Sequence, residues 1–413
     1  MKYIVIVGDG MSDLPIKELN GKTPLEVANT KWMDFIAKEG KVGLLKTLMK
    51  GMPYSSETAN LSILGYDPRK YYLGGRGPFE AKSLGINLKG NEIVIRINFI
   101  TVENGILKHY SAENISTKES KILINELNKK FGIKNELKFY PGVGYRGVLI
   151  LKNPIKNPNK YSEKLKFWPP HELKGKEIKR YFPKPLEKNA EKTAEILNEI
   201  IINSQKILSK SKVNKRRIQK GNLPANMIWF WSAGKYREIP KFKDKFKISG
   251  AIISAVSLIK GIGKAIGLSV IDVPNATASF DTNYKGKAEY ALNALKDDDF
   301  VYIHVKAPDD LSHDGDVKRK IKAIELIDKE IVGRIIKKMQ NLKYNFKIAI
   351  LSDHTTSTQT GKHTPDPVPF AIYSSLNKNR RDLVKEFNEN SATHGSYGLK
   401  QGTEFMKILL KNG

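Results

Sequence analysis

The chain has 413 residues, of which 40% are hydrophobic, and its 71 basic residues against 43 acidic ones give a net charge of +28. This length predicts a large domain accompanied by a smaller one. No run approaches the ~20 apolar residues that a membrane span requires, and no charged-then-apolar leader is evident, so we expect a cytoplasmic protein that does not enter the membrane. Because the chain has no cysteine, a bound metal must take oxygen or imidazole ligands, which favours divalent ions such as Mn²⁺ or Mg²⁺.

The positive charge allows three interpretations: nucleic-acid binding, attraction of small anionic substrates, or a lysine-rich composition without a specific role. Residues 151–220 hold 19 basic and 7 acidic residues, but the rest of the excess is spread along the chain without interleaved aromatic residues. The sequence contains no recognisable nucleic-acid motif. We therefore expect a small-molecule partner rather than nucleic acid, and a nucleic-acid protein would instead show binding that weakens steeply with salt.

The first predicted element is a strand over residues 3–7, a continuous apolar run that suggests burial on both faces. Gly8, Asp9 and Gly10 follow it and predict a tight loop with Asp9 at the carboxyl end of the strand. From residue 92 the pattern becomes α+β. Its expected strands cover 92–102, 106–110, 137–140 and 147–151, with one helix that begins at the capping box of Ser116 and Glu119 and ends at Gly132.

A helix over residues 190–208 closes this middle segment, and the basic stretch 209–220 predicts a hinge or an exposed linker. Strand-like runs then recur at 227–231, 268–273, 300–305, 348–351 and 368–373, with helical patterns between several of them. This alternation predicts an α/β fold with a parallel sheet flanked by helices. We expect the α/β domain to comprise residues 1–73 and 210–413, and a smaller inserted α+β domain to comprise residues 74–209.

Potential metal ligands follow the expected strands. Asp309 and His313 lie four residues apart and would meet one ion if the loop turns helically, and Asp353 with His354 follows the strand at 348–351. His363 lies in a loop with three prolines, so it would be held rigidly. Ligands gather outside the carboxyl ends of parallel strands. These residues and Asp9 therefore predict a pocket for two metal ions, whereas we interpret His304, inside a strand, as a core residue.

Ser56 is the candidate nucleophile. A metal ion lowers the pKa of a bound hydroxyl, and a helix N-terminus favours both an alkoxide and an incoming phosphate. The alternative is that Ser55 or Ser56 only caps the helix that follows. Local sequence leaves both interpretations open.

Longer motifs carry a resemblance that covers nearly the whole chain. They are residues 19–26 (LNGKTPLE), 56–68 (SETANLSILGYDP), 75–81 (GRGPFEA) and 366–369 (DPVP). Together with the metal motifs they resemble the archaeal-type cofactor-independent (2,3-bisphosphoglycerate-independent) phosphoglycerate mutases of the alkaline phosphatase superfamily. The resemblance implies an alkaline-phosphatase-like metal-binding domain with an inserted substrate-binding lid.

The resemblance also implies roles for individual residues. Asp309, His313 and His363 would bind one divalent ion, and Asp9, Asp353 and His354 the other, while Ser56 contacts the metals and accepts the phosphoryl group. The implied reaction interconverts 3-phosphoglycerate and 2-phosphoglycerate in glycolysis and gluconeogenesis through a phosphoserine, without bisphosphoglycerate. Mn²⁺ is the expected ion, with Mg²⁺, Co²⁺ or Zn²⁺ as alternatives.

Basic side chains would hold the carboxylate and phosphate of the substrate, since the guanidinium fork grips both in a bidentate manner. The candidates are Arg76, Arg146, Arg216, Arg217 and Lys260. The chain departs from the family where a basic run is replaced by residues 109–116 (HYSAENIS), and Asn60 stands where relatives commonly have histidine. A related metal-dependent phosphotransferase or phosphohydrolase acting on another phosphorylated metabolite is therefore the alternative function.

Overall fold

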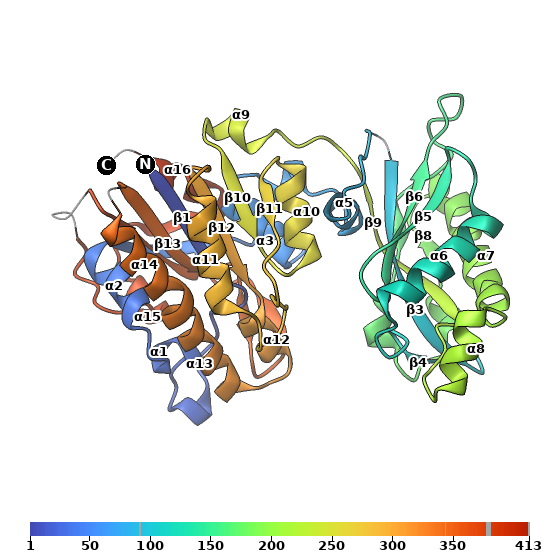
Figure 1. Cartoon of the computed structure of the whole chain (residues 1–413), viewed down its shortest axis with the longest axis horizontal. Helices are drawn as coiled ribbons and strands as arrows, with labels where there is room; N and C mark the ends of the chain where they lie inside the picture. The colour runs from blue at the N-terminus through green and yellow to red at the C-terminus, as the bar shows by residue number, and fades with distance from the viewer. Residues whose placement is uncertain (91, 343, 377–380, 412–413) are drawn as a thin grey trace. The chain divides into compact units, whose positions relative to one another are not determined.

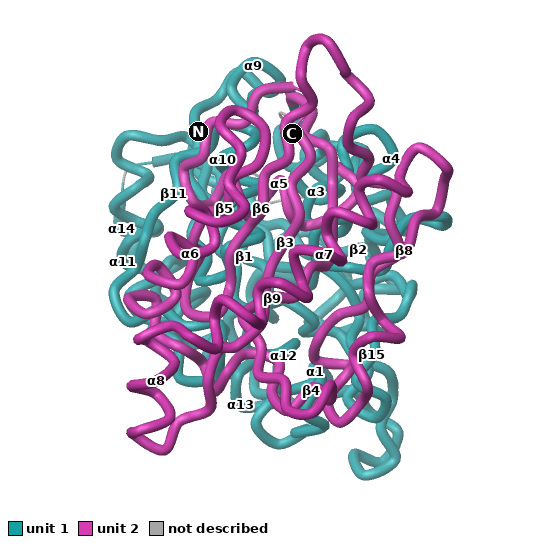
Figure 2. The backbone as a smooth tube through the Cα atoms, turned by 90° about the vertical axis from the view of Figure 1, so that its right-hand side faces the viewer, with its two compact units in different colours: residues 1–72, 239–413 teal, residues 73–238 magenta. Residues whose placement is uncertain are grey.

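The computed structural model describes residues 1–90, 92–342, 344–376 and 381–411, and it divides into two compact units, drawn in different colours in Figure 2. Unit 1 combines Met1–Tyr72 with Ile239–Gly413, and unit 2 is the continuous segment Leu73–Glu238. No helix in the described ranges is both long and apolar enough to cross a bilayer.

Unit 1 is built on one eight-stranded sheet. Its strands lie in the order β11 (Ser269–Ile271), β10 (Gly250–Ile253), β12 (Phe300–Val305), β1 (Lys2–Gly8), β13 (Phe346–Ser352), β16 (Val368–Ser374), β2 (Lys41–Lys46) and β17 (Gly398–Gln401). The first five strands are parallel, β16 is antiparallel to both of its neighbours, and β17 is parallel to β2. The expected α/β class with a mostly parallel sheet is thus confirmed.

Helices cover both faces of this sheet. They are α1 (Pro24–Val27), α2 (Lys31–Glu39), α3 (Ser56–Ile63), α4 (Pro68–Tyr71), α9 (Phe242–Phe246), α10 (Ser257–Ala265), α11 (Tyr284–Ala294), α12 (Ala307–His313), α13 (Val317–Leu326), α14 (Gly333–Asn341), α15 (Glu389–Ala392) and α16 (Phe405–Leu410). Figure 1 shows α11, α13 and α14 on one side of the sheet, where their apolar faces share a core with Ile4, Ile303 and Ile348. Tyr302 extends from the opposite face and reaches α3.

The strand register brings distant loops together. In β1, Gly8 pairs with Val305 at the end of β12 and with Ser352 at the end of β13. The next residues, Asp9 and Asp353 among them, therefore leave the sheet side by side. A short ribbon of β14 (Thr355–Ser357) and β15 (Lys362–Thr364) continues from β13 at the same edge.

Unit 2 contains an antiparallel sheet. Its strands are β4 (Ile106–His109), β3 (Glu92–Glu103), β6 (Arg146–Lys152) and β5 (Leu137–Pro141) in that order, with β9 (Met227–Lys235) also paired to β3. Two smaller strands, β7 (Leu165–Lys166) and β8 (Lys184–Pro185), pair separately. Helices α6 (Thr117–Phe131) and α7 (Glu191–Leu208) pack on the same face of the main sheet (Figure 1), while α5 (Gly77–Ser83) contacts β3 and β9. The predicted capping box of α6 is present, with Ser116 and Glu119 bonding each other's backbone N–H.

The second expected domain boundary, between residues 209 and 210, does not match the compact units. Residues 212–219 form helix α8 (Lys212–Gln219), not the predicted linker, and residues 227–231 belong to β9 of unit 2. Two buried side chains hold α8: Asn214 bonds Leu208 O and both backbone groups of Ala225, and Arg217 pairs with Glu119. The stretch was predicted to be exposed because its composition is basic, and the tertiary contacts of Asn214 and Arg217 cannot be read from the local sequence.

A candidate metal centre at the sheet edge

The expected ligands of the first metal ion meet at one carboxylate. Helix α12 begins directly after β12, and its turn places Asp309 and His313 on one side, as their spacing predicts. The Nε2 atoms of His313 and His363 lie 3.2 and 3.3 Å from the two oxygens of Asp309, and 3.3 Å from each other. These three residues offer ligand atoms that all lie within 4.8 Å of one another.

The expected ligands of the second ion also converge. His354 Nε2 lies 3.4 Å from Asp9 Oδ1 and 3.6 Å from Asp353 Oδ2. The side chains of all three are buried. Asp9 joins the two groups of ligands, because it also forms a close set with Asp309 and His354.

Ser56 is the first residue of α3, after the N-cap Ser55. Neither serine caps the helix through its side chain, since Ser55 makes no such hydrogen bond and the Ser56 hydroxyl lies 3.2 Å from His354 Nε2. Ser55 is therefore the N-cap by position, as the alternative allowed, but without a capping hydrogen bond from its side chain. The Ser56 hydroxyl lies instead among the candidate ligands.

The histidine rings present the same nitrogen to the cluster. Nδ1 of His313 lies 2.7 Å from Gly361 O, and Nδ1 of His363 lies 2.9 Å from Tyr54 O. A carbonyl oxygen only accepts, so each Nδ1 donates its proton away from the cluster. In the neutral rings the lone pairs on Nε2 then face the Asp309 carboxylate, an arrangement that a cation between them would stabilise.

The carboxylates carry more negative charge than their neighbours balance. Burial opposes ionisation of Asp9 and Asp309, yet the Lys306 ammonium holds the pKa of both carboxyls below the usual range. Burial and the charge of Asp9 instead raise the pKa of Asp353 well above its usual range. Burial also lowers the pKa of His354 to about 3, so this imidazole stays neutral. Asp9 and Asp309 thus stay ionised beside the single ammonium of Lys306, which leaves a deficit of positive charge.

Divalent ions fit this donor set. Both oxygens of Asp9 and Nε2 of His304 are buried and make no hydrogen bond of good geometry within the described residues, although Nε2 lies 3.1 Å from Asp9 Oδ2. Buried polar atoms are normally satisfied. Carboxylate oxygens and imidazole nitrogens are ligands that Mn²⁺, Zn²⁺ and related ions accept. The seven residues expected as ligands would hold them: Asp9, Ser56, Asp309, His313, Asp353, His354 and His363.

Sequence reasoning did not assign three neighbours to this cluster, although it had weighed His304 as a core residue and noted Asn60 as a departure from the family. His304, interpreted as a core residue, is buried but places Nε2 3.1 Å from Asp9 Oδ2. Lys306 pairs with Asp309 and lies 3.6 Å from Asp9. Asn60 donates from Nδ2 to Asp353 Oδ2 at 2.8 Å and to Ser56 O at 2.8 Å. The Tyr302 hydroxyl donates to Oδ1 of Asn60. The position of Lys306 directly after β12 was the available signal for its role.

The expected substrate binders lie in different surroundings. Arg76 and Arg146 belong to unit 2, where both charges act on the buried Arg96, which sequence reasoning also missed. Burial lowers the pKa of Arg96 to about 10, and Arg96 pairs with Glu80 at 3.2 Å while lying 4.1 Å from the centre of the Trp231 ring. Arg146 donates to the Tyr145 hydroxyl and keeps Nε buried without a hydrogen bond among the described residues.

The three remaining candidates have other surroundings. Arg217 is buried and donates to Ala112 O and Leu223 O as well as Glu119, which is a structural arrangement. Arg216 is exposed on α8. Lys260 lies on α10 of unit 1 and pairs with Asp272.

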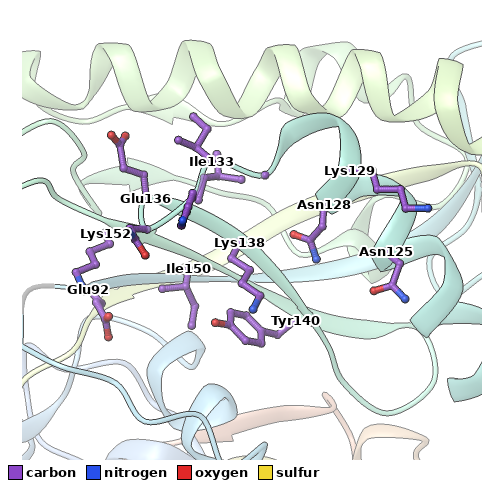
Figure 3. Close-up of a pocket in the computed structure, with 14 residues that line it drawn as sticks. Glu92, Asn125, Asn128, Lys129, Ile133, Glu136, Lys138, Tyr140, Ile150 and Lys152 are labelled. Atoms are coloured by element: carbon purple, nitrogen blue, oxygen red, sulfur yellow. The ribbon is translucent and has the colours of Figure 1, made fainter.

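Unit 2 also contains a cavity of about 810 Å³ between the end of α6 and strands β5 and β6 (Figure 3). Its polar lining includes Asn128, Tyr140 and the four lysines Lys129, Lys134, Lys138 and Lys152. Every lining residue lies between 92 and 152. The cavity is therefore lined entirely by residues of unit 2.

Comparison with known proteins identifies one family. The family model described as 2,3-bisphosphoglycerate-independent phosphoglycerate mutase matches residues 37–214. A protein of that name from Methanosarcina barkeri is 43% identical over 411 residues, which cover 100% of both chains.

Two solved structures are similar to this chain over nearly its whole length. The PH0037 protein from Pyrococcus horikoshii is 33% identical with a TM-score of 0.80, covering 100% of this chain and 99% of its own. A cofactor-independent phosphoglycerate mutase from Thermoplasma acidophilum is 28% identical with a TM-score of 0.67, and 99% of each chain is covered.

Proposed function

Because the chain belongs to the family of 2,3-bisphosphoglycerate-independent phosphoglycerate mutases, we propose that the carboxylate and imidazole cluster of unit 1 is its dimetal centre and Ser56 its phosphoryl acceptor. The chain is an isomerase that interconverts 3-phosphoglycerate and 2-phosphoglycerate, and it uses divalent metal ions and no bisphosphoglycerate. The cytoplasmic location expected from the sequence stays a prediction. The observation that carries the proposal is the contact of the Ser56 hydroxyl with His354 amid the expected ligands.

In the proposed reaction, Ser56 Oγ loses its proton and forms a bond to phosphorus, while the bond from phosphorus to the 3-oxygen of the substrate breaks and that oxygen takes up a proton. Glycerate then turns within the site, and its 2-hydroxyl loses its proton and bonds to phosphorus. The bond from phosphorus to Ser56 Oγ breaks, and the serine regains a proton. When bound, the metal ions would lower the pKa of the serine hydroxyl and neutralise charge on the phosphoryl oxygens. Mn²⁺ is the ion we propose.

The protein's own groups contribute in three ways. Ser56 lies at the N-terminus of α3, where backbone N–H groups favour an anion. Lys306 lies beside Asp9 and Asp309 and would stabilise the transferring phosphoryl group through its charge. Asn60 holds both the Ser56 backbone and Asp353 in place.

We propose that Arg76 and Arg146 bind the carboxylate and phosphate of the substrate. The support is their shared electrostatic influence on Arg96, which indicates a group of three guanidinium ions in unit 2. The buried Nε of Arg146 lacks a hydrogen-bond partner among the described residues, and an incoming anion would satisfy it. Arg216, Arg217 and Lys260 stay predictions with less support from their contacts.

The test is an assay of the purified chain with 3-phosphoglycerate and Mn²⁺, in the absence of bisphosphoglycerate. The expected product is 2-phosphoglycerate with little free phosphate, and chelation of the metal should abolish its formation. Acid-quenched enzyme should carry a phosphate on Ser56, detectable by peptide mass spectrometry. Release of free phosphate as the main product would instead favour the phosphohydrolase.

A further inference from the structure

The hydroxyl of Thr356 joins ligands assigned to the two different metal ions. Thr356 belongs to β14 and is completely buried. Its Oγ1 donates to Asp309 Oδ1 at 2.7 Å and lies 3.0 Å from Nδ1 of His354. The side chain thus contacts one residue from each set of expected ligands.

The direction of these hydrogen bonds follows from counting protons. A hydroxyl has one proton, and the ionised carboxylate of Asp309 can only accept. The Thr356 proton therefore goes to Asp309, so the contact with His354 requires a proton on Nδ1 of the imidazole. In the neutral ring, Nε2 then carries the lone pair, and it faces Ser56 Oγ and Asp9.

In all three histidines of the cluster, a hydrogen-bond acceptor holds the ring proton on Nδ1, but the acceptors are of two kinds. His313 and His363 donate from Nδ1 to backbone carbonyls, which no substitution at Gly361 or Tyr54 removes directly. The acceptor for His354 Nδ1 is instead the side-chain hydroxyl of Thr356. Of the three acceptors, this hydroxyl is consequently the one that a substitution can remove.

The backbone of Thr356 is itself fixed. Its N–H donates to Ser12 O at 3.0 Å, and its carbonyl accepts from the buried Lys320 ammonium at 3.1 Å. Gly10 leaves room for the hydroxyl, since a Cβ there would lie 2.6 Å from Thr356 Oγ1 and 2.6 Å from Asp309 Oδ1, and its φ of +57° also favours glycine. The hydroxyl is therefore held in a defined place between the two ligands.

We propose that Thr356 is a positioning residue that fixes the ring tautomer of His354 and the orientation of Asp309, so that both are ready to bind metal. The tautomer follows from the contacts alone, while its consequence for metal binding rests on the proposed function. Removal of such an outer hydrogen-bond partner typically weakens metal binding by about 10–100-fold.

The test compares Thr356→Val, which keeps the shape but deletes the hydroxyl, with Thr356→Ser, which keeps the hydroxyl. Titration calorimetry with Mn²⁺ should show affinity reduced by about 10–100-fold for the valine variant and by less than about 3-fold for the serine variant. Thermal unfolding of the metal-free proteins checks that both variants fold. Equal affinities for the valine variant and the wild type would overturn the proposal.

A second measurement needs no variant of Thr356. In the metal-free protein labelled with ¹⁵N-histidine, NMR spectra distinguish a protonated from an unprotonated ring nitrogen, and His354→Asn identifies the signals of His354. We expect the proton on Nδ1, and a proton on Nε2 would overturn the proposal even if the valine variant did not fold. Because this readout involves neither metal nor turnover, it stands or fails independently of mutase activity.

Discussion

The Ser56 hydroxyl and the His354 imidazole lie 3.2 Å apart, from Oγ to Nε2, although 298 residues separate them in the chain. The contact exists because α3 begins beside the carboxyl end of β13, where Asp353 and His354 leave the sheet. It places the proposed nucleophile and a candidate metal ligand in one hydrogen-bonded pair.

Replacing Ser56 by alanine should reduce mutase turnover by at least about 10³-fold, since no other hydroxyl takes its place as acceptor. Ser55→Ala is the matched control, because the Ser55 side chain makes no capping hydrogen bond. Steady-state assays should show near-normal turnover for that control. Substantial activity of Ser56→Ala would show that phosphoryl transfer bypasses the serine.

Replacing Asn60 by leucine should lower the free energy of unfolding by roughly 2–4 kcal/mol, because Asp353 and the Tyr302 hydroxyl would lose buried partners. Tyr302→Phe removes one hydroxyl and should cost only about 1 kcal/mol. Urea denaturation of the metal-free proteins measures both. Equal costs for the two variants would mean that Asn60 does not organise this network.

Metal affinity should rise with pH around neutrality. The hydrogen bond to Asp309 raises the pKa of His313 above its usual value, so in the metal-free protein this ring holds a proton that the metal must displace. Calorimetry in buffers of different ionisation enthalpy should detect proton release on metal binding that declines as pH rises through the raised pKa of His313. His313→Gln should bind more weakly and lose this proton release.

The raised pKa of His313 also determines how the stability of the metal-free protein changes with pH. Because the folded-state pKa of His313 is raised, its stabilisation of the metal-free protein is present below about pH 6.5 and is lost as pH rises through the raised pKa. Thermal unfolding of metal-free wild type and His313→Gln across this range should show a difference that shrinks with increasing pH. A constant difference would contradict the coupling.

Replacing Lys320 by methionine should cost about 3–5 kcal/mol, because the carboxylate of the buried Asp13 would lose its 2.8 Å partner. The double variant Asp13→Asn with Lys320→Met removes both charges and should lose less than the sum of the single costs. Chemical denaturation of all four proteins completes the cycle. Additive losses would show that the pair does not act as a unit.

Replacing Arg146 by methionine should raise KM for 3-phosphoglycerate by about 10-fold or more, since a charged hydrogen bond to the substrate contributes about 1.5–3 kcal/mol. Arg146→Lys should recover part of the loss, because it restores charge but not the guanidinium fork. Mn²⁺ affinity should not change in either variant. An unchanged KM would remove Arg146 from the substrate site.

The sequence predicted that the candidate ligands gather at one edge of the sheet, because several of them follow the strands closely in the chain. Asp9 and Asp353 directly follow apolar runs, so the rule that ligands gather at the carboxyl ends of parallel strands was enough to group them. The same rule did not identify His304, because its position inside β12 predicted a core residue. Its proximity to Asp9 is visible only in the folded structure.

The sequence did not predict roles that depend on contacts between residues far apart in the chain. The basic run at residues 209–220 gave no sign that Arg217 would be buried against Glu119, and Arg96 sits in β3 directly between the apolar Ile95 and Ile97. Thr356 is likewise an ordinary polar residue until the ribbon of β14 and β15 brings it to Asp309. Local patterns describe elements, but these roles arise from pairs far apart in the chain.

The interruption of unit 1 by unit 2 has a consequence for synthesis on the ribosome. Unit 2 is one continuous segment and can collapse as soon as residue 238 has emerged, whereas Tyr3 of β1 must await Phe300 of β12. At translation rates of about 5–20 residues per second, the nascent first strand stays unpaired for roughly 15–60 s. Its apolar side chains are exposed to other chains during that delay, so cotranslational chaperones should matter most for the amino-terminal strand.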